Sequence, residues 1–266
     1  MTTQERHGNS DASHPPHDRP RVNRDTSLLR YRLAKANMKV EHYRADAIEA
    51  HCREVILSLL ERDPTAQLLD LGCADGTFTS RVAKRIGTAS VCGIDAVQEN
   101  IASAKARGID AHLADLDQGI PFEDEVFDVI CASHVIEHVC DTDLVVRETY
   151  RLLRSGGYLV IATPNLAAAH NILLLIFGKQ PTIAEVSDVA LVGPVSPRGN
   201  CVARVGPSHR RIFTFPALKG LLEYYGYGVE KTVGAGYFPF PAILSRGMCL
   251  VDRVHSTNIV LKARKG

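Results

Sequence analysis

The chain has 266 residues and a mass of 29.1 kDa, with 45% hydrophobic residues, 23% charged residues and a net charge of +1. These values are typical of soluble globular proteins, and they exclude a chain that is disordered throughout, a collagen and a coiled coil. A net charge so close to zero produces no general field that would attract nucleic acid or a membrane. The charge is nevertheless uneven, because residues 67–164 carry −7 and residues 165–266 carry +7.

The seven cysteines are an odd number and form no CxxC pair or Cys/His cluster. We therefore expect reduced thiols in a cytoplasmic protein. The first 25 residues lack the apolar stretch of a secretion signal. The most apolar run, Leu166–Phe177, is too short to span a bilayer.

The first 66 residues divide into two parts. Residues 1–27 are polar and rich in Pro, His, Asp and Arg, which predicts a disordered tail. In residues 28–66 apolar side chains recur at intervals of three and four, which predicts an N-terminal helical extension.

From residue 67 onward, short apolar runs alternate with amphipathic segments. The runs predict strands at 67–71, 90–94, 110–113, 126–132, 158–162, 227–233 and 259–262. The segments predict helices at 77–86, 97–107, 142–153 and 216–225. This alternation is typical of parallel βαβ units, so we predict one α/β domain over residues 67–266. Its fold would be Rossmann-like, with a doubly wound, seven-stranded, mostly parallel sheet and helices on both faces.

The first predicted strand runs into a glycine turn, Asp70-Leu71-Gly72-Cys73-Ala74-Asp75-Gly76, before a helix. Such a turn allows a ligand to approach the backbone at a helix N-terminus. The spacing is not the GxGxxG of dinucleotide-binding folds, and the acids would repel a pyrophosphate. A ligand with both an ammonium and a carboxylate group would fit instead.

Two further acids follow the next two strands. Asp95 ends the second strand, where a carboxylate can accept hydrogen bonds from two ribose hydroxyls. Asp115 follows the third strand, where it can accept from the exocyclic amine of a purine. The ligand that these groups indicate has an amino-acid end, a ribose and a purine, as S-adenosylmethionine (SAM) does.

The chain resembles class I SAM-dependent methyltransferases of the methyltransferase domain 11/23 type. The resemblance covers about residues 67–165 and rests on the segments LLDLGCADGTF, VCGIDAV, AHLADLD, PFEDEVFDVICASHVIEHV and LLRSGGYLVIATPN. It implies the seven-stranded fold and SAM as the cofactor.

The resemblance also implies individual roles in cofactor binding. Asp70 and Gly72 would hold the methionine ammonium and carboxylate, and Asp95 would hold the ribose. Asp115 and Leu116 would hold adenine, and Ser133 and His134 would line the methionine and the sulfonium. The remaining residues assigned to cofactor binding are Cys73, Ala74, Gly76 and Ala96.

His134, Glu137 and His138 are spaced to share one helical face. They could orient the loop and the cofactor, or His134 or His138 could act as a catalytic general base. A third reading is a metal site formed by Glu137, His138 and His209. Related O-methyltransferases of ubiquinone synthesis and of small-RNA 2′-O-methylation bind a divalent ion through Glu-x-x-Glu-His here. Because His134 replaces the first Glu of that pattern, we expect no metal cofactor.

The C-terminal third contains two segments outside the βα pattern. Residues 165–210 form an insertion that we expect to cover the substrate, and its arginines (Arg198, Arg204, Arg210 and Arg211) form either a solvated loop or a basic mouth for an anionic substrate. The apolar segment Pro239–Val254 would form a packed helix or a membrane-touching surface, and we favour packing.

We therefore predict methyl transfer from SAM to an oxygen of a small molecule, sugar or lipid-linked glycan. The alternatives are a metal-assisted O-methyltransferase of the quinone-precursor or RNA 2′-hydroxyl type, a non-catalytic SAM-binding protein and a nicotinamide oxidoreductase. We expect a monomer or homodimer with no nucleic-acid partner and no transmembrane segment, and we leave peripheral membrane contact open.

Overall fold

The computed structural model describes residues 45–266 except 182, 188–189, 192–201 and 204–207. The predicted tail at 1–27 and the first part of the predicted extension at 28–66 lie outside the described residues. The rest of that extension is helical at residues 45–59, as the periodicity predicts.

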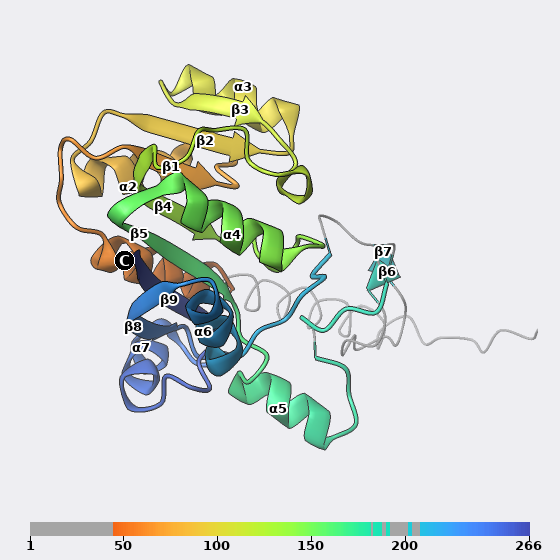
Figure 1. The fold of residues 1–266 in the computed structure, drawn as a ribbon. Helices are drawn as coiled ribbons and strands as arrows, with labels where there is room; N and C mark the ends of the chain where they lie inside the picture. The colour runs from red at the N-terminus through yellow and green to blue at the C-terminus, as the bar shows by residue number, and fades with distance from the viewer. Residues whose placement is uncertain (1–44, 182, 188–189, 192–201, 204–207) are drawn as a thin grey trace, which may run out of the picture. The chain divides into compact units, whose positions relative to one another are not determined.

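Seven strands form one sheet in the order β3-β2-β1-β4-β5-β9-β8 (Figure 1). They are β1 (Leu68–Leu71), β2 (Val91–Asp95), β3 (Asp110–Leu113), β4 (Phe127–Ser133), β5 (Leu153–Pro164), β8 (Tyr227–Ala235) and β9 (Asn258–Lys265). The strands β3, β2, β1, β4 and β5 are parallel to one another, and β9 is antiparallel to both β5 and β8. This arrangement confirms the predicted Rossmann-like, mostly parallel seven-stranded sheet.

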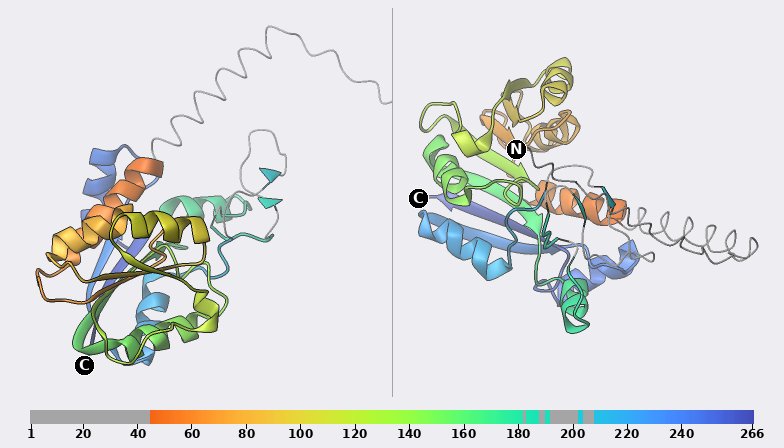
Figure 2. Two further views of the ribbon diagram at one scale, coloured as in Figure 1. Left: turned by 90° about the horizontal axis from the view of Figure 1, so that it is seen from above. Right: turned by 90° about the vertical axis from the view of Figure 1, so that its right-hand side faces the viewer.

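Helices cover both faces of the sheet. Successive side chains of a central strand point to opposite faces, and they are buried on both. In β5, Tyr158 and Val160 pack with the helix at 45–59 and with α2 (Thr77–Ile86), whereas Leu159 and Ile161 pack with α4 (Thr142–Leu152) and α6 (Phe215–Tyr224). The helix α3 (Gln98–Ala106) covers β2 and β3 through Ile101 and Ala104. The right-hand view of Figure 2 shows the sheet separating α4 and α6 from the helix at 45–59.

The helices begin and end where local chemistry dictates. Asp141 caps α4 by accepting a hydrogen bond from Leu144 N, and Thr214 caps α6 by accepting one from Ala217 N. The helix α2 has the predicted bounds, and Gly87 ends it in the left-handed conformation. Each of these ends satisfies backbone groups that a helix terminus leaves unpaired.

The predicted boundary between α4 and β5 is wrong by several residues. The sequence predicts a helix to Leu153 and a strand from Tyr158, whereas β5 already begins at Leu153, which pairs with Phe127 of β4. The register then shifts between Phe127 and Val129. Such an irregularity adds residues to the strand without continuing its alternation of apolar side chains, so the sequence pattern does not reveal where the strand begins.

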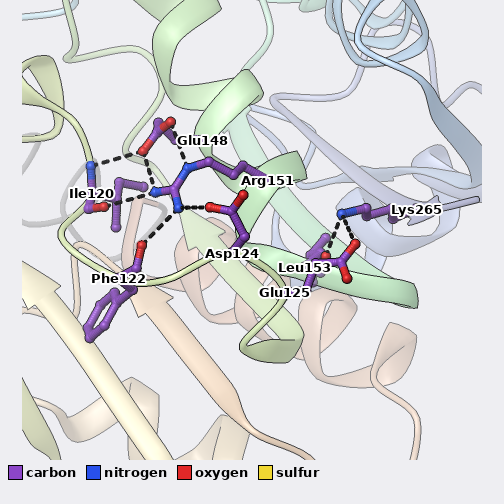
Figure 3. Close-up of polar contacts among 8 residues, drawn as sticks. All are labelled: Ile120, Phe122, Asp124, Glu125, Glu148, Arg151, Leu153 and Lys265. Carbon is purple, nitrogen blue, oxygen red and sulfur yellow. Dashed lines mark hydrogen bonds and ion pairs between the residues drawn. The ribbon is translucent and has the colours of Figure 1, made fainter.

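Arg151 holds the loop between β3 and β4 against α4 (Figure 3). Its guanidinium donates to the carbonyls of Ile120 and Phe122 and to the carboxylates of Asp124 and Glu148. These hydrogen bonds, led by the one to Glu148, raise the pKa of Arg151. Five donors in a planar fork allow one side chain to satisfy several acceptors, which fixes the loop.

Lys265 makes a second connection at this side of the sheet (Figure 3). Its ammonium donates to the Leu153 carbonyl and to the Glu125 carboxylate. The C-terminal strand is thereby joined to the start of β5 and to the loop before β4.

The insertion contains α5 (Ala169–Ile176) and a separate two-stranded antiparallel sheet of β6 (Ala190–Leu191) and β7 (Val202–Ala203). Arg198 and Arg204 lie outside the described residues. The helix α7 (Ala242–Val251) lies in the apolar segment Pro239–Val254. The prediction that this segment packs against the rest of the protein is wrong for most of α7. Only Ser245 and Cys249 of α7 are buried, whereas Ile243, Leu250 and Val251 are exposed.

The glycine turn before α2 provides a test of the packing. A Cβ at Gly76 (φ +80°) would lie 2.5 Å from Ile109 Cδ1 and 3.1 Å from Ala104 Cα, so Gly76→Ala combines an unfavourable backbone conformation with a steric clash. We expect a loss of about 2–4 kcal/mol in the free energy of unfolding, measured by urea denaturation. Gly108→Ala is the matched control, because Gly108 has φ +82° and nothing within 4 Å of a Cβ, and it should lose only about 1–2 kcal/mol. Equal losses in the two variants would contradict the packing around Gly76.

Candidate functional site

The carboxyl ends of β3, β2, β1 and β4 meet at one edge of the sheet, because these strands are parallel and in register. Asp70 of β1 pairs with Gly93 of β2, and Asp95 at the end of β2 pairs with Leu113 of β3. The ends of β1 and β4 are aligned in the same way. The side chains that the sequence assigns to a cofactor therefore come from neighbouring strand ends (Figure 1). Loops beyond such an edge are the usual ligand site of open α/β sheets.

The glycine turn has an unusual backbone conformation. Gly72, Ala74 and Gly76 all have positive φ, at +70°, +47° and +80°. A Cβ at Gly72 would lie 2.5 Å from Val135 Cγ2, so the turn passes close to the loop that follows β4. Cys73 is buried with its side chain against Gly93, so a ligand could meet only its backbone. The left-handed conformation of Ala74 is costly for a residue with a Cβ, and such strain is concentrated at functional sites.

Asp95 connects the glycine turn to α3. Its Oδ2 accepts a hydrogen bond from Ala74 N at 2.9 Å, and its Oδ1 accepts from Val97 N at 2.9 Å and from Asn100 Nδ2 at 3.0 Å. A carboxylate offers about four acceptor positions, so the half-buried Asp95 retains acceptor capacity for a ligand hydroxyl. The neighbouring Ala96 is exposed.

Asp70 differs from the expectation of a carboxylate open to a ligand. It is only 3% exposed, and its Oδ2 accepts a hydrogen bond from Thr79 Oγ1 at 2.5 Å. Burial raises the pKa of Asp70 to about 7, and the hydrogen bond from Thr79 opposes this effect only in part. Direct contact between Asp70 and the methionine ammonium stays a prediction, and its carboxylate has little surface for it.

Asp115 is exposed after β3, and Leu116 beside it is half-buried. The Asp115 carboxylate accepts from Asp117 N at 3.0 Å and so caps a short 3-10 helix, Leu116–Gln118. Asp117, which sequence reasoning missed, accepts hydrogen bonds from the backbone N–H groups of Cys140 and Asp141. It thereby joins the predicted adenine-binding loop to the loop after β4.

Ser133 and His134 are half-buried at the end of β4. His134 has φ +56°, and its Nε2 lies 3.3 Å from Asn258 Oδ1 of β9. Its Nδ1 lies 3.3 Å from Ser133 Oγ and 3.8 Å from Glu49 Oε2 of the helix at 45–59. The contacts with Glu49 and Asn258 join segments that are distant in the chain, so no local signal in the sequence could have found them.

The prediction that His134, Glu137 and His138 share one helical face is wrong. They lie in a bend and a turn, because β4 ends at Ser133 and α4 starts only at Thr142. His134 contacts β9, whereas His138 lies beside Glu137 and His209. His138 and His209 pack with their ring centroids 5.1 Å apart.

Glu137, His138 and His209 form a cluster in which the possible ligand atoms all lie within 4.8 Å of one another. Glu137 is buried, and its Oε2 accepts from Thr163 Oγ1 at 3.0 Å. Among the described residues, its Oε1 has no hydrogen-bond partner, and neither does His209 Nδ1. Such unpartnered buried polar atoms are rare and need an explanation, such as an ion or a ligand. Burial lowers the pKa of His209 and so favours its neutral form, which can bind a metal.

His138 is held in one orientation. Its Nδ1 lies 2.9 Å from the Ser208 carbonyl oxygen, so Nδ1 carries the proton that is donated there. The acceptor lone pair is then on Nε2, which lies 4.0 Å from Glu137 Oε1. A neutral histidine in this orientation can accept a proton or bind a metal ion.

A pocket of about 300 Å³ lies beside this cluster. It is lined by Glu185, Val186, Ser187, Ser208, His209, Arg210 and Arg211. The Arg210 and Arg211 backbones donate to the Glu137 carbonyl, and the Arg211 guanidinium donates to the Cys140 carbonyl. The insertion thus brings His209 and two arginines to the loop after β4.

The six cysteines in the described part of the chain are all free, as predicted. Burial raises the pKa of the Cys73 thiol to about 12 and raises that of Cys131 as well. These two thiols stay protonated at neutral pH and are not nucleophiles.

Comparison with known proteins identifies the class of this domain. Residues 69–161 match the family described as "Methyltransferase domain". The mitochondrial ubiquinone biosynthesis O-methyltransferase of Rattus norvegicus is 29% identical over 183 residues, which cover 65% of this chain and 48% of that protein. The ubiquinone biosynthesis O-methyltransferase of Bartonella quintana is 33% identical over 128 residues, which cover 44% of this chain and 51% of that protein. The chain thus spans about half the length of the curated relatives it matches.

A solved structure has the same fold. An S-adenosylmethionine-dependent methyltransferase from Mesorhizobium loti superposes with a TM-score of 0.54 and 19% identity, covering 80% of this chain and 96% of that one. The central part of the chain is therefore a methyltransferase domain. Its fold is that of the SAM-dependent methyltransferase just named.

The match and the fold imply SAM as the cofactor, and the residues at the strand ends fit it. The half-buried Asp95 and the exposed Asp115 offer acceptors for ribose hydroxyls and an adenine amine. The glycine turn exposes backbone at Gly72 and Ala74 for the amino-acid end. The acceptors are carboxylates, which suit a ligand with a positively charged sulfonium and ammonium.

Replacement of Asp70 gives a pH-dependent test of the site. Because the pKa of Asp70 is about 7 in the folded state and 3.8 ordinarily, the folded chain binds this proton more tightly, and stability should fall as the pH rises from about 4 to 7. Asp70→Asn cannot ionise, so at pH 8 it should be more stable than the parent by about 1–4 kcal/mol, with little difference at pH 4.5. Urea unfolding at the two pH values measures the effect.

Asp75→Asn is the control, because the pKa of Asp75 is shifted in the opposite direction from that of Asp70. Hydrogen bonds from Thr77 lower the pKa of Asp75, so this exposed carboxylate stabilises the fold when it is ionised. Asp75→Asn should therefore give no gain at pH 8. An Asp70→Asn variant less stable than the parent at pH 8 would show that the ionised carboxylate is needed in the core.

Proposed function

We propose that this chain is a SAM-dependent O-methyltransferase that acts on a hydroxyl group of a small molecule. The observation that supports it best is that His138, in the loop after β4, packs against His209, which lines the pocket of about 300 Å³. A histidine near both the strand ends and a pocket is suited to methyl transfer to oxygen, since it can accept the proton of a hydroxyl.

The proposed cofactor contacts come from the strand ends. Asp95 accepts from the ribose hydroxyls, Asp115 accepts from the adenine amine, and the Leu116 backbone binds the ring. Gly72 contacts the amino-acid end through its backbone, and Ser133 and His134 line the methionine. When bound, SAM supplies an activated methyl group, so the protein mainly has to align the two reactants.

The acceptor atom is assigned to oxygen for two reasons. The curated relatives named above are O-methyltransferases of ubiquinone biosynthesis. A hydroxyl must also lose its proton during transfer, and the proposed role of His138 as a base meets that need. Arg211 at the pocket favours an acceptor with a negative group, since its guanidinium can bind a carboxylate or phosphate.

His138 is the proposed general base. The Ser208 carbonyl holds the proton on Nδ1, so Nε2 is free to take the proton of the acceptor hydroxyl. As that proton moves to Nε2, the acceptor oxygen forms a bond to the methyl carbon. The bond between methyl carbon and sulfur breaks, and its electron pair stays on sulfur. His134, held between Asn258 and Glu49, lines the methyl-donor side.

The purified chain, SAM labelled in its methyl group and a panel of phenols, catechols and hydroxy acids test this proposal. We expect one acceptor class to gain a methyl ether on oxygen, identified by mass spectrometry and NMR. Asp95→Ala should weaken the binding of S-adenosylhomocysteine by about 5–150-fold in calorimetry, because it removes a charged acceptor worth about 1–3 kcal/mol. Glu99→Ala, an exposed acid on α3, is the control and should bind normally. Unchanged affinity in Asp95→Ala would contradict the ribose assignment.

A metal-assisted form of the same reaction is the second candidate. It is favoured by the unpartnered Glu137 Oε1 and His209 Nδ1 beside His138, which form a set of one oxygen and two nitrogen ligands. This set fits Zn²⁺ or Co²⁺ better than Mg²⁺, since imidazole is a poor ligand for Mg²⁺. The hydrogen bond from His138 to the Ser208 carbonyl resembles the outer contacts that orient metal-binding histidines. An ion bound there would lower the pKa of the acceptor hydroxyl, and His138 would then not be a base.

Metal binding distinguishes the two candidates independently of activity. If the cluster holds an ion, the dialysed chain should bind about one equivalent of Zn²⁺, measured by elemental analysis, and bound Co²⁺ should give a visible absorption band. Glu137→Gln and His209→Ala should each weaken binding by about 10-fold or more. His255→Gln is the control, because His255 pairs with Asp252 outside the cluster. A chain that binds neither ion would exclude the metal and leave His138 as the base.

A further inference from the structure

Two helices outside the sheet expose large aliphatic side chains to solvent. On α7, Ile243 and Leu250 are each 90% exposed and Val251 is 86% exposed. On and directly after α5, Ile176 is 72% exposed and Phe177 is 69% exposed. Single exposed apolar residues are common, but a concentration of this kind marks an interaction surface.

The exposed side chains of α7 lie on one face of the helix. Ser245 and Cys249, four residues apart, are buried, and Ser245 Oγ accepts from Tyr237 N at 2.6 Å. Ile243 and Leu250 are seven residues apart and therefore share the opposite face. The buried face of α7 therefore carries small side chains, and its exposed face carries aliphatic ones.

The loop after α7 is hydrogen-bonded to the start of α5. Ala169 N at the start of α5 donates to the His255 carbonyl, and Asn165 Nδ2 donates to the Val254 carbonyl, both after α7. The His170 ring lies 5.2 Å from the ring of Phe238, which precedes α7. We call the exposed side chains of α5 and α7, with Phe177, the α5–α7 surface; Figure 1 shows where the two helices lie.

The charge around the α5–α7 surface is mainly positive. Neither helix contains Asp or Glu, while Lys179 follows α5 and Arg246 and Arg253 lie in and after α7. All three cations are exposed, and Arg246 also pairs with Glu54. Asp252, which follows α7, is bound by His255 and Tyr237. Aliphatic side chains flanked by cations are typical of helices that lie in the headgroup region of a membrane.

We propose that the α5–α7 surface docks this protein on a lipid bilayer that contains anionic headgroups. The exposed residues project outward from helices and are mainly aliphatic, as insertion into lipid requires, whereas the centres of protein–protein interfaces are enriched in aromatic residues. No helix in the described ranges is long and apolar enough to cross a membrane. This inference goes beyond the proposed function and does not depend on it.

Sedimentation with vesicles tests the proposal on the full chain. We expect binding to vesicles of phosphatidylcholine mixed with phosphatidylglycerol and weaker binding to phosphatidylcholine alone. Ile243→Asp combined with Leu250→Asp should lower the partition coefficient by about 10-fold or more, since it places two charges in the inserted face. Lys179→Gln combined with Arg253→Gln should weaken binding to the anionic vesicles and change binding to phosphatidylcholine little.

Tyr224→Asp is the matched control, because Tyr224 is also highly exposed but lies at the end of α6. It should bind vesicles as the parent does. Circular dichroism and thermal unfolding should be unchanged in all variants, since the replaced side chains are exposed and pack on little else.

Two results would overturn the proposal. One is the absence of binding to either vesicle type, or binding that Ile243→Asp with Leu250→Asp leaves unchanged. The other is a dimer in sedimentation velocity that this double variant dissociates, without vesicle binding by the parent chain. The latter result would assign the α5–α7 surface to a second copy of the chain.

Discussion

The parallel register of β3, β2, β1 and β4 is the constraint on which the candidate site depends. Backbone hydrogen bonds align Asp70 with Gly93 and Asp95 with Leu113, so the loops that follow these strands open at the same edge. A shift of one residue in β2 would turn Asp95 to the other face of the sheet and remove it from the glycine turn. The covered faces make such a shift costly, because each central strand buries side chains on both sides.

Several acids at this edge hold the loops together. Asp95 bonds to Ala74 N in the glycine turn, and Asp117 bonds to the backbone after β4. Asp70 and Glu137 are buried and depend on the hydroxyls of Thr79 and Thr163. A carboxylate in such a place is costly unless it is hydrogen-bonded, so these pairs position the backbone at this edge of the sheet. The acidic middle of the chain thus holds these loops together, besides the cofactor contacts that we propose for it.

The same edge connects the site to the α5–α7 surface. The chain leaves the site at Pro164, the end of β5, and enters α5 five residues later, while β8 leads toward α7. Both helices therefore start near the carboxyl edge of the sheet, because β5 and β8 run in the same direction beside β9. The insertion contains α5 and carries His209 to Glu137, so α5 and the pocket lined by His209 belong to one continuous part of the chain.

The sequence by itself determined the α/β fold, the bounds of α2 and β3 and the order of the strand-end acids, because apolar periodicity and glycine turns are local signals. It also indicated His209 as a partner of Glu137 and His138. Only the tertiary structure decided that Asp70 is buried, that His134 turns toward Asn258 and that α7 leaves its aliphatic face uncovered. Burial and long-range contacts depend on which segments the fold brings against a side chain, and no pattern within a single segment contains that information.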